Sequence, residues 1–138
     1  MKVVLDTNVL MAAFATQGLC HALLEVCIDQ HEIVLSLNIL KEVVAVLEKK
    51  LKVPSKIAKD VADYLTNHAT LQKTKHLEKR ISRDPSDDHI LALAEQSKSD
   101  YIITGDEDLL ILKQYQGIPI VLPRRFWEIL KNKETRAD

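Results

Sequence analysis

The 138-residue sequence has little of what marks several common protein classes. Its three glycines are too few for the glycine-rich phosphate loop of a P-loop or dinucleotide-binding fold. Aromatic residues make up 4% of the chain, which leaves few platforms on which bases could stack. No apolar run approaches the roughly 20 residues of a membrane span, and Met1 leads into an expected strand without the layout of a signal peptide. We therefore expect a soluble, cytoplasmic protein.

The cysteines and histidines are few and lack the spacing of a disulfide or a zinc site. The two cysteines, Cys20 and Cys27, fall in one expected helix about 10 Å apart along its axis, beyond the Cα separation of about 7 Å that a disulfide allows. The five histidines show no H-x-x-x-H spacing and the cysteines form no C-x-x-C pair. We expect two free thiols and no structural zinc site.

What the chain does contain is a regular alternation of short β-branched runs and helical patterns. Strands are expected over 2–5, 32–35, 69–74, 101–104 and 118–122. Helices are expected over 19–28, from the cap Ser36 to the residues before Pro54, and over 55–67, 84–98 and 124–131. The alternation predicts a three-layer α/β domain with a mainly parallel, five-stranded sheet over residues 1–131, followed by a polar tail, 132–138.

Acidic residues gather where ligands bind in such sheets, at the carboxyl ends of the strands. Carboxylates brought together repel one another unless protons are retained or a cation neutralises them. Oxygen ligands alone suit a hard cation, Mg²⁺ or Mn²⁺, which points to phosphodiester hydrolysis by a metal-activated water. The candidate metal ligands, from two strand ends and two neighbouring helices, are Asp6, Glu42, Asp87, Asp88, Asp106 and Asp108.

Each acid also has a purely structural interpretation. Glu42 lies at the border of its helix's apolar arc and could simply be solvated, and acids in the first turn of the helix at Asp84-Pro85 satisfy amide donors and the helix dipole. We prefer Asp87 over Asp88 as the site residue because Asp87 is in line with the apolar stripe, and we keep Asp88 as an accessory. Asp108 either caps the segment that follows or completes the site.

Four motifs, in order, resemble the PIN domain, and most of all the PIN-type toxin components of bacterial and archaeal toxin-antitoxin systems. The resemblance extends over about residues 1–130. Its motifs are Asp6-Thr7-Asn8-Val9-Leu10, Ser36 with Glu42, Arg83-Asp84-Pro85-Ser86-Asp87-Asp88, and Thr104-Gly105-Asp106-Glu107-Asp108-Leu109.

The resemblance implies an α/β/α sandwich, an Mg²⁺- or Mn²⁺-dependent endoribonuclease, and a homodimer or higher homo-oligomer often held inactive by a small antitoxin protein. By position, Asp6, Glu42, Asp87 and Asp106 match the family's catalytic quartet. The doubled acids Asp87-Asp88 and Asp106/Asp108 leave the third and fourth ligands open by a residue or two. The matching supporting polar positions are Thr7, Asn8, Thr104 and Asp108, although Thr7 and Asn8 are equally good turn formers.

Other functions fit less well. A phosphatase of the haloacid dehalogenase type needs an acid two residues after its nucleophilic Asp, where this chain has Asn8. A receiver domain needs an Asp after the third strand and a Lys after the fifth, and neither is convincingly placed. A catalytically silent RNA-binding or assembly module would have no reason to keep so costly a cluster of charge. Flap-type DNA nucleases carry helical insertions for which 138 residues leave little room.

The net charge of -1 excludes a histone-like binder but is unevenly distributed. Residues 49–83 contain ten Lys or Arg and three acids, a net charge of +7, and the remainder carries -8. We expect this basic segment to help hold the RNA backbone, although a charge run is often only a solvated face. Its groups are Lys49, Lys50 and Lys52, and Lys73, Lys75, Lys79, Arg80 and Arg83.

Overall fold

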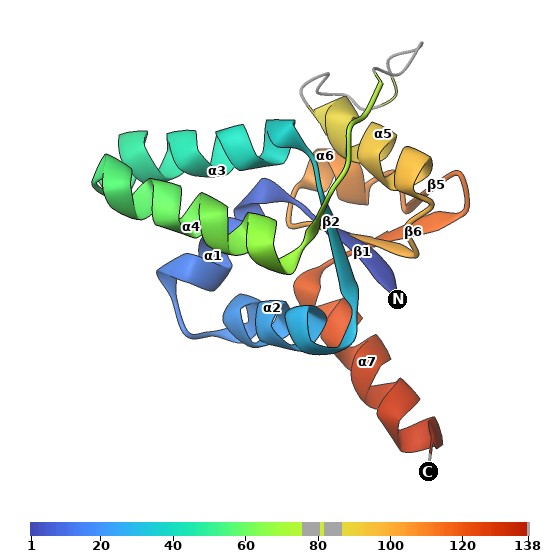
Figure 1. Cartoon of the computed structure of the whole chain (residues 1–138). Coiled ribbons are helices and arrows are strands. Elements are labelled where there is room, and N and C mark those ends of the chain that lie inside the picture. The colour runs from blue at the N-terminus through green and yellow to red at the C-terminus, as the bar shows by residue number, and fades with distance from the viewer. Residues whose placement is uncertain (76–80, 82–86, 138) are drawn as a thin grey trace.

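In the part of the chain that the structure describes, six strands form one sheet, in the order β3-β2-β1-β4-β6-β5. The computed structural model describes residues 1–75, 81 and 87–137 (Figure 1). Neighbouring strands are parallel except for the antiparallel pair β5–β6. The strands are β1 (Lys2–Leu5), β2 (Glu32–Leu35), β3 (Thr70–Leu71), β4 (Tyr101–Ile103), β5 (Gln114–Tyr115) and β6 (Ile118–Val121).

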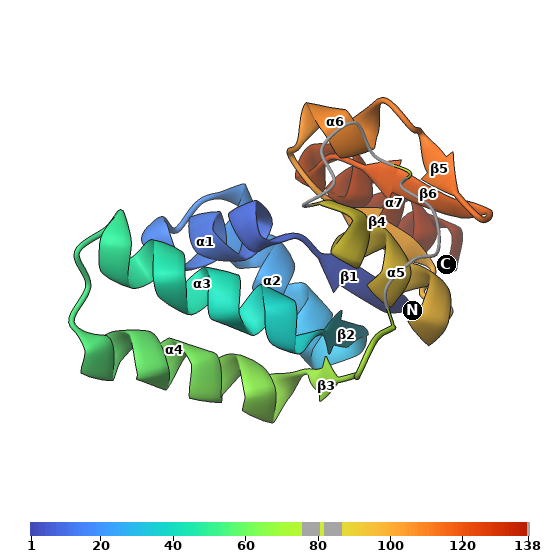
Figure 2. The same cartoon turned by 90° about the horizontal axis from the view of Figure 1, so that it is seen from above.

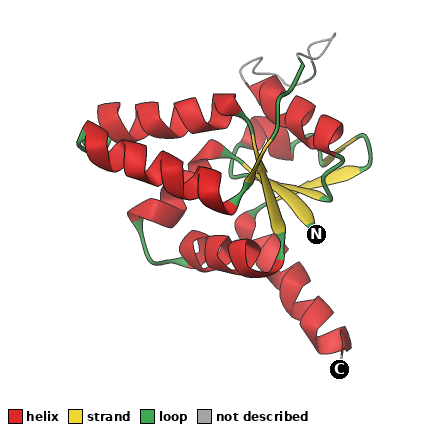
Figure 3. Ribbon diagram, viewed as in Figure 1, coloured by secondary structure: helices red, strands yellow, loops and turns green. Residues whose placement is uncertain are grey.

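Helices lie on both sides of the sheet, which makes the three-layer α/β arrangement visible in Figure 3. Helix α5 contacts β1, β2 and β4 on one face, and α2 packs with α7 on the other (Figure 1). Helices α3 and α4 lie side by side beyond β2 (Figure 2). The helices are α1 (Thr7–Ala15), α2 (Leu19–Gln30), α3 (Leu37–Lys49), α4 (Ser55–His68), α5 (Asp88–Ser97), α6 (Glu107–Leu110) and α7 (Pro123–Ala137).

The central strands are continuous apolar runs because both of their faces are covered. In β1, Val3 and Val4 are completely buried, and so are Ile102 and Ile103 of β4. Polar residues then stop each run and begin the next helix. Asp6 caps α1, and Ser36 caps α3 by accepting a hydrogen bond from the Ile39 amide at 3.2 Å.

The strand order reverses direction between β1 and β4. From β1 the chain proceeds outward to β2 and β3 on one side, and then crosses back to β4 and β6 on the other. The gap at such a switch point is where open α/β sheets bind ligands. Leu5 is paired with Ile103, so Asp6 and Thr104, the next residue of each strand, leave the sheet side by side.

The predicted fold class is confirmed, with one strand more than expected. The five predicted strands are all present, although the third is only Thr70–Leu71. The additional strand, β5, forms a hairpin with β6 through Gln116 and Gly117, whose φ angles are 52° and 79°. Two positive φ angles in succession are typical of a tight hairpin turn. A two-residue strand is too short to produce a periodic pattern, which is why it was not predicted.

The last helix is longer than predicted. The predicted end of the last helix near Lys131 is wrong, because α7 continues to Ala137. Residues 132–137 contain neither glycine nor proline, so nothing in the polar tail stops the helix. The predicted helix start at Asp84-Pro85 lies outside the described residues, and the described helix α5 begins at Asp88 with Asp87 as its N-cap residue.

Both cysteines are free, as predicted, and both lie in α2. Burial raises the pKa of the Cys27 thiol to about 12, so this side chain is a neutral part of the core.

Within the described residues, no single helix is long and apolar enough to cross a membrane. Helices α1 and α2 reach that length and hydropathy only when joined, and they are bent by 106° at the break between them.

Candidate metal centre

Asp6 is buried at the switch point and is held by hydrogen bonds on both carboxylate oxygens. Its side chain is 7% exposed, and its backbone amide still donates to the Ile103 carbonyl oxygen at 3.0 Å. One carboxylate oxygen, Oδ1, accepts from the Thr7 amide at 2.7 Å, and the other, Oδ2, accepts from the Thr104 hydroxyl at 2.7 Å. The first carboxylate is therefore fixed to the ends of both β1 and β4.

The turn after β4 carries the next acids. The buried Thr104 hydroxyl also accepts a hydrogen bond from the Asp106 amide at 3.0 Å. Asp106 in turn accepts from the Asp108 amide at 2.9 Å and caps the short helix α6. The side-chain amide of Asn8 lies beside this turn, 3.7 Å from where a Cβ on Gly105 would be. One hydroxyl, that of Thr104, thus links the acid after β1 to the acids after β4.

Three carboxylates from two segments converge next to this turn. Oxygen atoms of Asp87, Asp106 and Asp108 lie within 4.8 Å of one another. Asp87 comes from the start of α5, whereas the neighbouring Asp88 accepts a hydrogen bond from the Ile81 amide at 3.2 Å. The structure therefore places Asp87, rather than Asp88, with the acids of the β4 turn.

Glu42 reaches the same edge from α3 and is held from two sides. Its Oε2 accepts from the Thr7 hydroxyl at 2.7 Å, and its Oε1 accepts from His89 Nε2 at 2.8 Å. Sequence reasoning missed His89, because it tested the histidines only for zinc-ligand spacing. The available signal was its place two residues after Asp87 in the first turn of α5, but the partner on α3 is set by tertiary packing.

The pKa values of Asp6 and Glu42, the two acids that accept hydrogen bonds from Thr7, shift in opposite directions. Burial raises the pKa of Asp6 above its ordinary 3.8, against the hydrogen bonds from Thr104 and Thr7, and the charges of Asp106 and Glu42 raise it further. The hydrogen bond from His89 lowers the pKa of Glu42, although burial acts in the opposite direction. Glu42 therefore ionises readily, whereas Asp6 carries the electrostatic cost of the cluster.

The pKa of His89 shifts upward. Burial alone would lower it, but the hydrogen bond and charge of Glu42, with the charges of Asp6 and Asp87, raise it above the ordinary 6.5. The imidazole therefore keeps its proton to higher pH than an unperturbed histidine does.

The donor set fits a hard divalent cation. Asp87, Asp106 and Asp108 offer three carboxylate oxygens close enough to be shared by one ion, with Asp6 and Glu42 adjacent to them. No thiol or imidazole belongs to this group of three, and oxygen-only sites suit Mg²⁺, Mn²⁺ or Ca²⁺ rather than zinc. A cation there would also relieve the repulsion between the carboxylates.

Lys49, Lys50 and Lys52, three of the predicted basic contacts, lie away from these acids. Lys49, Lys50 and Lys52 are exposed around the α3–α4 connection, at the end of the helix pair farthest from α5 (Figure 1). Lys49 is seven residues beyond Glu42 on α3, or about 10 Å along the helix. Lys73 and Lys75 are exposed in the segment after β3, and Lys79, Arg80 and Arg83 lie outside the described residues.

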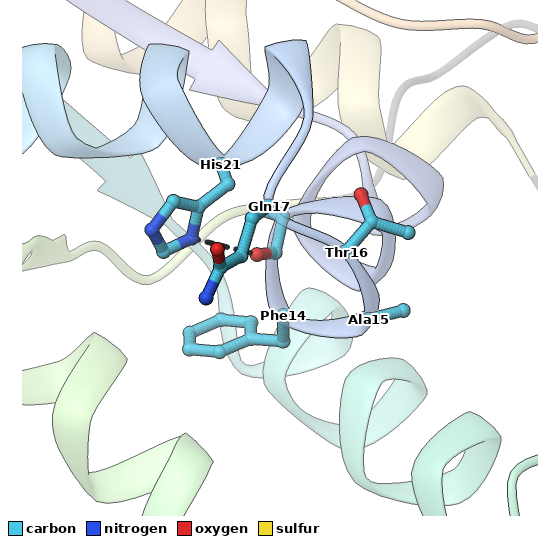
Figure 4. Close-up of a pocket in the computed structure, with 6 residues that line it drawn as sticks. Phe14, Ala15, Thr16, Gln17 and His21 are labelled. Carbon is cyan, nitrogen blue, oxygen red and sulfur yellow. Dashed lines mark hydrogen bonds between the residues drawn. The ribbon is translucent and has the colours of Figure 1, made fainter.

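A hollow of about 390 Å³ lies at the end of α1 and is separate from the acids. Figure 4 shows Phe14, Gln17 and His21 around it, with the His21 Nδ1 hydrogen donated to the Ala13 carbonyl oxygen at 3.0 Å. This hydrogen bond connects the start of α2 to the end of α1, so His21 has a structural role.

Comparison with known sequences identifies the family. The sequence model described as "PIN domain" matches residues 2–108, more than three quarters of the chain. The chain belongs to the PIN domain family. A comparison with curated protein sequences gives no match.

Solved PIN-type structures share the fold at low sequence identity. VapBC2 from Rickettsia felis, bound to a DNA fragment from its promoter, is 14% identical with a TM-score of 0.65, and the match covers 88% of this chain and 98% of that one. Mycobacterium tuberculosis VapC20, a sarcin-ricin loop cleaving toxin, is 13% identical with a TM-score of 0.58 and coverage of 85% and 98%. The PIN domain endonuclease Utp24 is 21% identical with a TM-score of 0.56 and coverage of 88% and 84%.

Adjacent acids in this PIN domain allow a matched test of the metal centre. We expect Mn²⁺ at about 100 times its dissociation constant to stabilise the wild-type chain by about 2.7 kcal/mol. Asp87→Asn should lose most of this gain, and Asp88→Asn, one residue away, should keep it. Urea unfolding with Mn²⁺ or with EDTA measures both. Equal losses in the two variants would contradict the placement of Asp87 in the site.

The pKa of Asp6 predicts a pH-dependent stability of the metal-free PIN domain. Because the folded-state pKa is raised, the folded chain holds this proton more tightly than the unfolded chain does. That contribution to stability is complete below pH 3.8 and is lost as the pH rises through the folded pKa. We therefore compare the free energies of unfolding of wild type and Asp6→Asn in EDTA. The value for wild type minus that for Asp6→Asn should fall as the pH rises from 3.8 through the folded-state pKa of Asp6.

The control for that experiment is Thr104→Val. It removes a hydrogen bond that lowers the pKa of Asp6, so the decline should extend to higher pH in this background. Urea unfolding at a series of pH values measures the free energy of unfolding of each chain. If the value for wild type minus that for Asp6→Asn does not change with pH, the pKa of Asp6 is not raised.

Proposed function

We propose that this PIN domain is a divalent-metal-dependent endoribonuclease. The observation that carries the proposal is the convergence of Asp6, Glu42, Asp87, Asp106 and Asp108, from four separate segments, at the switch point of one sheet. The neighbours' names agree with it, since VapC20 cleaves the sarcin-ricin loop and Utp24 is an endonuclease. We propose Mg²⁺ or Mn²⁺ as the cofactor.

The side chains of the site have different proposed roles. Asp87, Asp106 and Asp108 would hold the cation together with Asp6 and Glu42. Asp6, Glu42, Asp87 and Asp106 form the proposed catalytic set. When bound, a divalent cation supplies positive charge that polarises the phosphodiester and acidifies a water molecule. Thr7 orients Glu42, and Thr104 orients both Asp6 and the turn that bears Asp106. These hydrogen bonds hold the carboxylates in position before the substrate binds. The carboxylates therefore do not have to move during the reaction.

The substrate's phosphates would meet two kinds of donor. Asn8 is exposed beside Gly105, so its amide can donate to a phosphate oxygen near the acids. Lys49, Lys50 and Lys52 are exposed farther along α3 and would hold the RNA backbone at a distance from the cleaved bond. Lys79, Arg80 and Arg83 belong to the same proposal on the basis of sequence alone.

We further propose that the chain is the toxin of a type II toxin-antitoxin pair and acts as a homo-oligomer in the cytoplasm. The similarity to the VapBC2 and VapC20 folds supports this assignment. The proposal requires a short neighbouring reading frame whose product binds this chain and stops its cleavage of RNA.

Cleavage of a mixed pool of single-stranded RNA tests the nuclease. We expect cleavage with Mg²⁺ or Mn²⁺, none with EDTA, and a loss of at least about 100-fold in Asp6→Asn, because Asp6 joins the two strand ends at the site. Asp63→Asn, an exposed acid on α4, is the matched control and should retain full activity.

Two outcomes would contradict the nuclease. Cleavage that persists in EDTA, or full activity in a folded Asp6→Asn chain, would exclude the proposed mechanism. RNA binding without cleavage would instead favour a catalytically silent module, and cleavage of DNA or of a phosphomonoester alone would favour the DNA nuclease or phosphatase alternative.

Charge reversal tests the role of the lysines at the α3–α4 connection. Lys49→Glu with Lys50→Glu should weaken RNA binding and reduce the slope of log affinity against log salt by about 0.7 for each phosphate that is no longer neutralised. The control, Arg124→Glu with Arg125→Glu on α7, makes the same change of charge at exposed positions. Fluorescence anisotropy with uncleaved RNA in EDTA measures both, and equal slopes in the two variants would leave the lysines as a solvated surface.

A further inference from the structure

Glu42 has an unusual position among the site's acids. It is carried by α3 rather than by a strand end, and its side chain is 44% exposed. The charges of Glu42 and Asp6 repel each other, and a half-exposed glutamate can turn its carboxylate into solvent. A group that keeps it at the sheet edge is therefore needed.

His89 is placed to supply that constraint. Its side chain is 15% exposed, and Nε2 lies 2.8 Å from Glu42 Oε1. The opposite ring nitrogen, Nδ1, is buried and has no hydrogen-bond partner among the described residues. The hydrogen bond to Glu42 is thus the polar contact that fixes the ring, and the Thr7 hydroxyl holds the other carboxylate oxygen at 2.7 Å.

The same turn of α5 also carries Asp87. Asp87 and His89 are two residues apart at the start of one helix, and they reach different partners: Asp87 joins Asp106 and Asp108, and His89 binds Glu42. A rigid turn that holds both side chains sets the position of the α3 acid relative to the group of three carboxylates. The hydrogen bond between His89 and Glu42 thus joins α3 to the start of α5.

We propose that His89 is a positioning residue of the nuclease site, which holds the Glu42 carboxylate against Thr7 at the edge of the metal centre. This inference rests on the proposed function. His89 acts through Glu42 and touches neither the cation nor the RNA. Removing its N–H donor should weaken the site as removing the Glu42 charge does, and a side chain that restores the donor should restore the site.

Three variants separate positioning from simple packing. His89→Leu keeps an apolar side chain of similar bulk without the donor. His89→Gln carries an amide N–H at about the place of Nε2 and keeps the hydrogen bond. Glu42→Gln removes the carboxylate charge that His89 holds. Each is measured for Mn²⁺ affinity by electron paramagnetic resonance of free Mn²⁺ without RNA, for kcat and KM on RNA, and for unfolding in EDTA.

We expect His89→Leu to lower Mn²⁺ affinity and kcat by about 10-fold or more, the usual effect of losing a residue that orients a ligand. KM for RNA should change by less than about 3-fold, and His89→Gln should recover to within about 3-fold of wild type. Adding His89→Leu to Glu42→Gln should cause little further loss, because both act on one interaction.

The opposite results overturn the proposal. Equal defects in His89→Leu and His89→Gln, or losses that add fully to those of Glu42→Gln, would make His89 a packing residue. If His89→Leu does not fold, His89→Ala, which also removes the donor, is combined with Glu42→Gln to measure the same coupling. A wild-type chain that binds Mn²⁺ but does not cleave RNA would contradict the nuclease, while the Mn²⁺ affinities of the variants would still decide the role of His89.

Discussion

The hydrogen bond between the Thr104 hydroxyl and the Asp6 carboxylate is the interaction on which the site depends. It joins the first residues beyond β1 and β4, two strands that are neighbours in the sheet but 98 residues apart in sequence. Without a donor there, a carboxylate that is 7% exposed would lose half of its hydrogen bonding and face two other acids. The bond is possible because the parallel register pairs Leu5 with Ile103.

The rest of the site extends from this bond in two directions. Through the Thr104 oxygen it reaches the Asp106 amide and then α6, and through the Thr7 residue that follows Asp6 it reaches Glu42 and then His89 on α5. The site therefore contains a connected chain of hydrogen bonds that links α6, α1, α3 and α5. Such networks have a defined geometry only when each member has its partner.

Much of this arrangement could be predicted from local sequence. The runs VVL and YII mark buried strands, and in a parallel sheet whatever follows them must lie at one edge, so Asp6 and Asp106 could be placed together. The choice of Asp87 over Asp88 also followed from helical periodicity. What local sequence could not supply was the contact between α3 and α5, because no periodic pattern fixes which side chains of two packed helices meet. His89 was missed for that reason, as β5 was for its length.

The register of β1 against β4 has a consequence for how this chain can change. Side chains alternate between the two faces of a strand, so inserting or deleting one residue within β1 or β4 would turn Asp6 or Thr104 to the opposite face. An insertion in the connections between elements would leave that alternation intact. Over evolutionary time the spacing between the motifs is therefore free to drift, whereas the count of residues inside these two short strands is not.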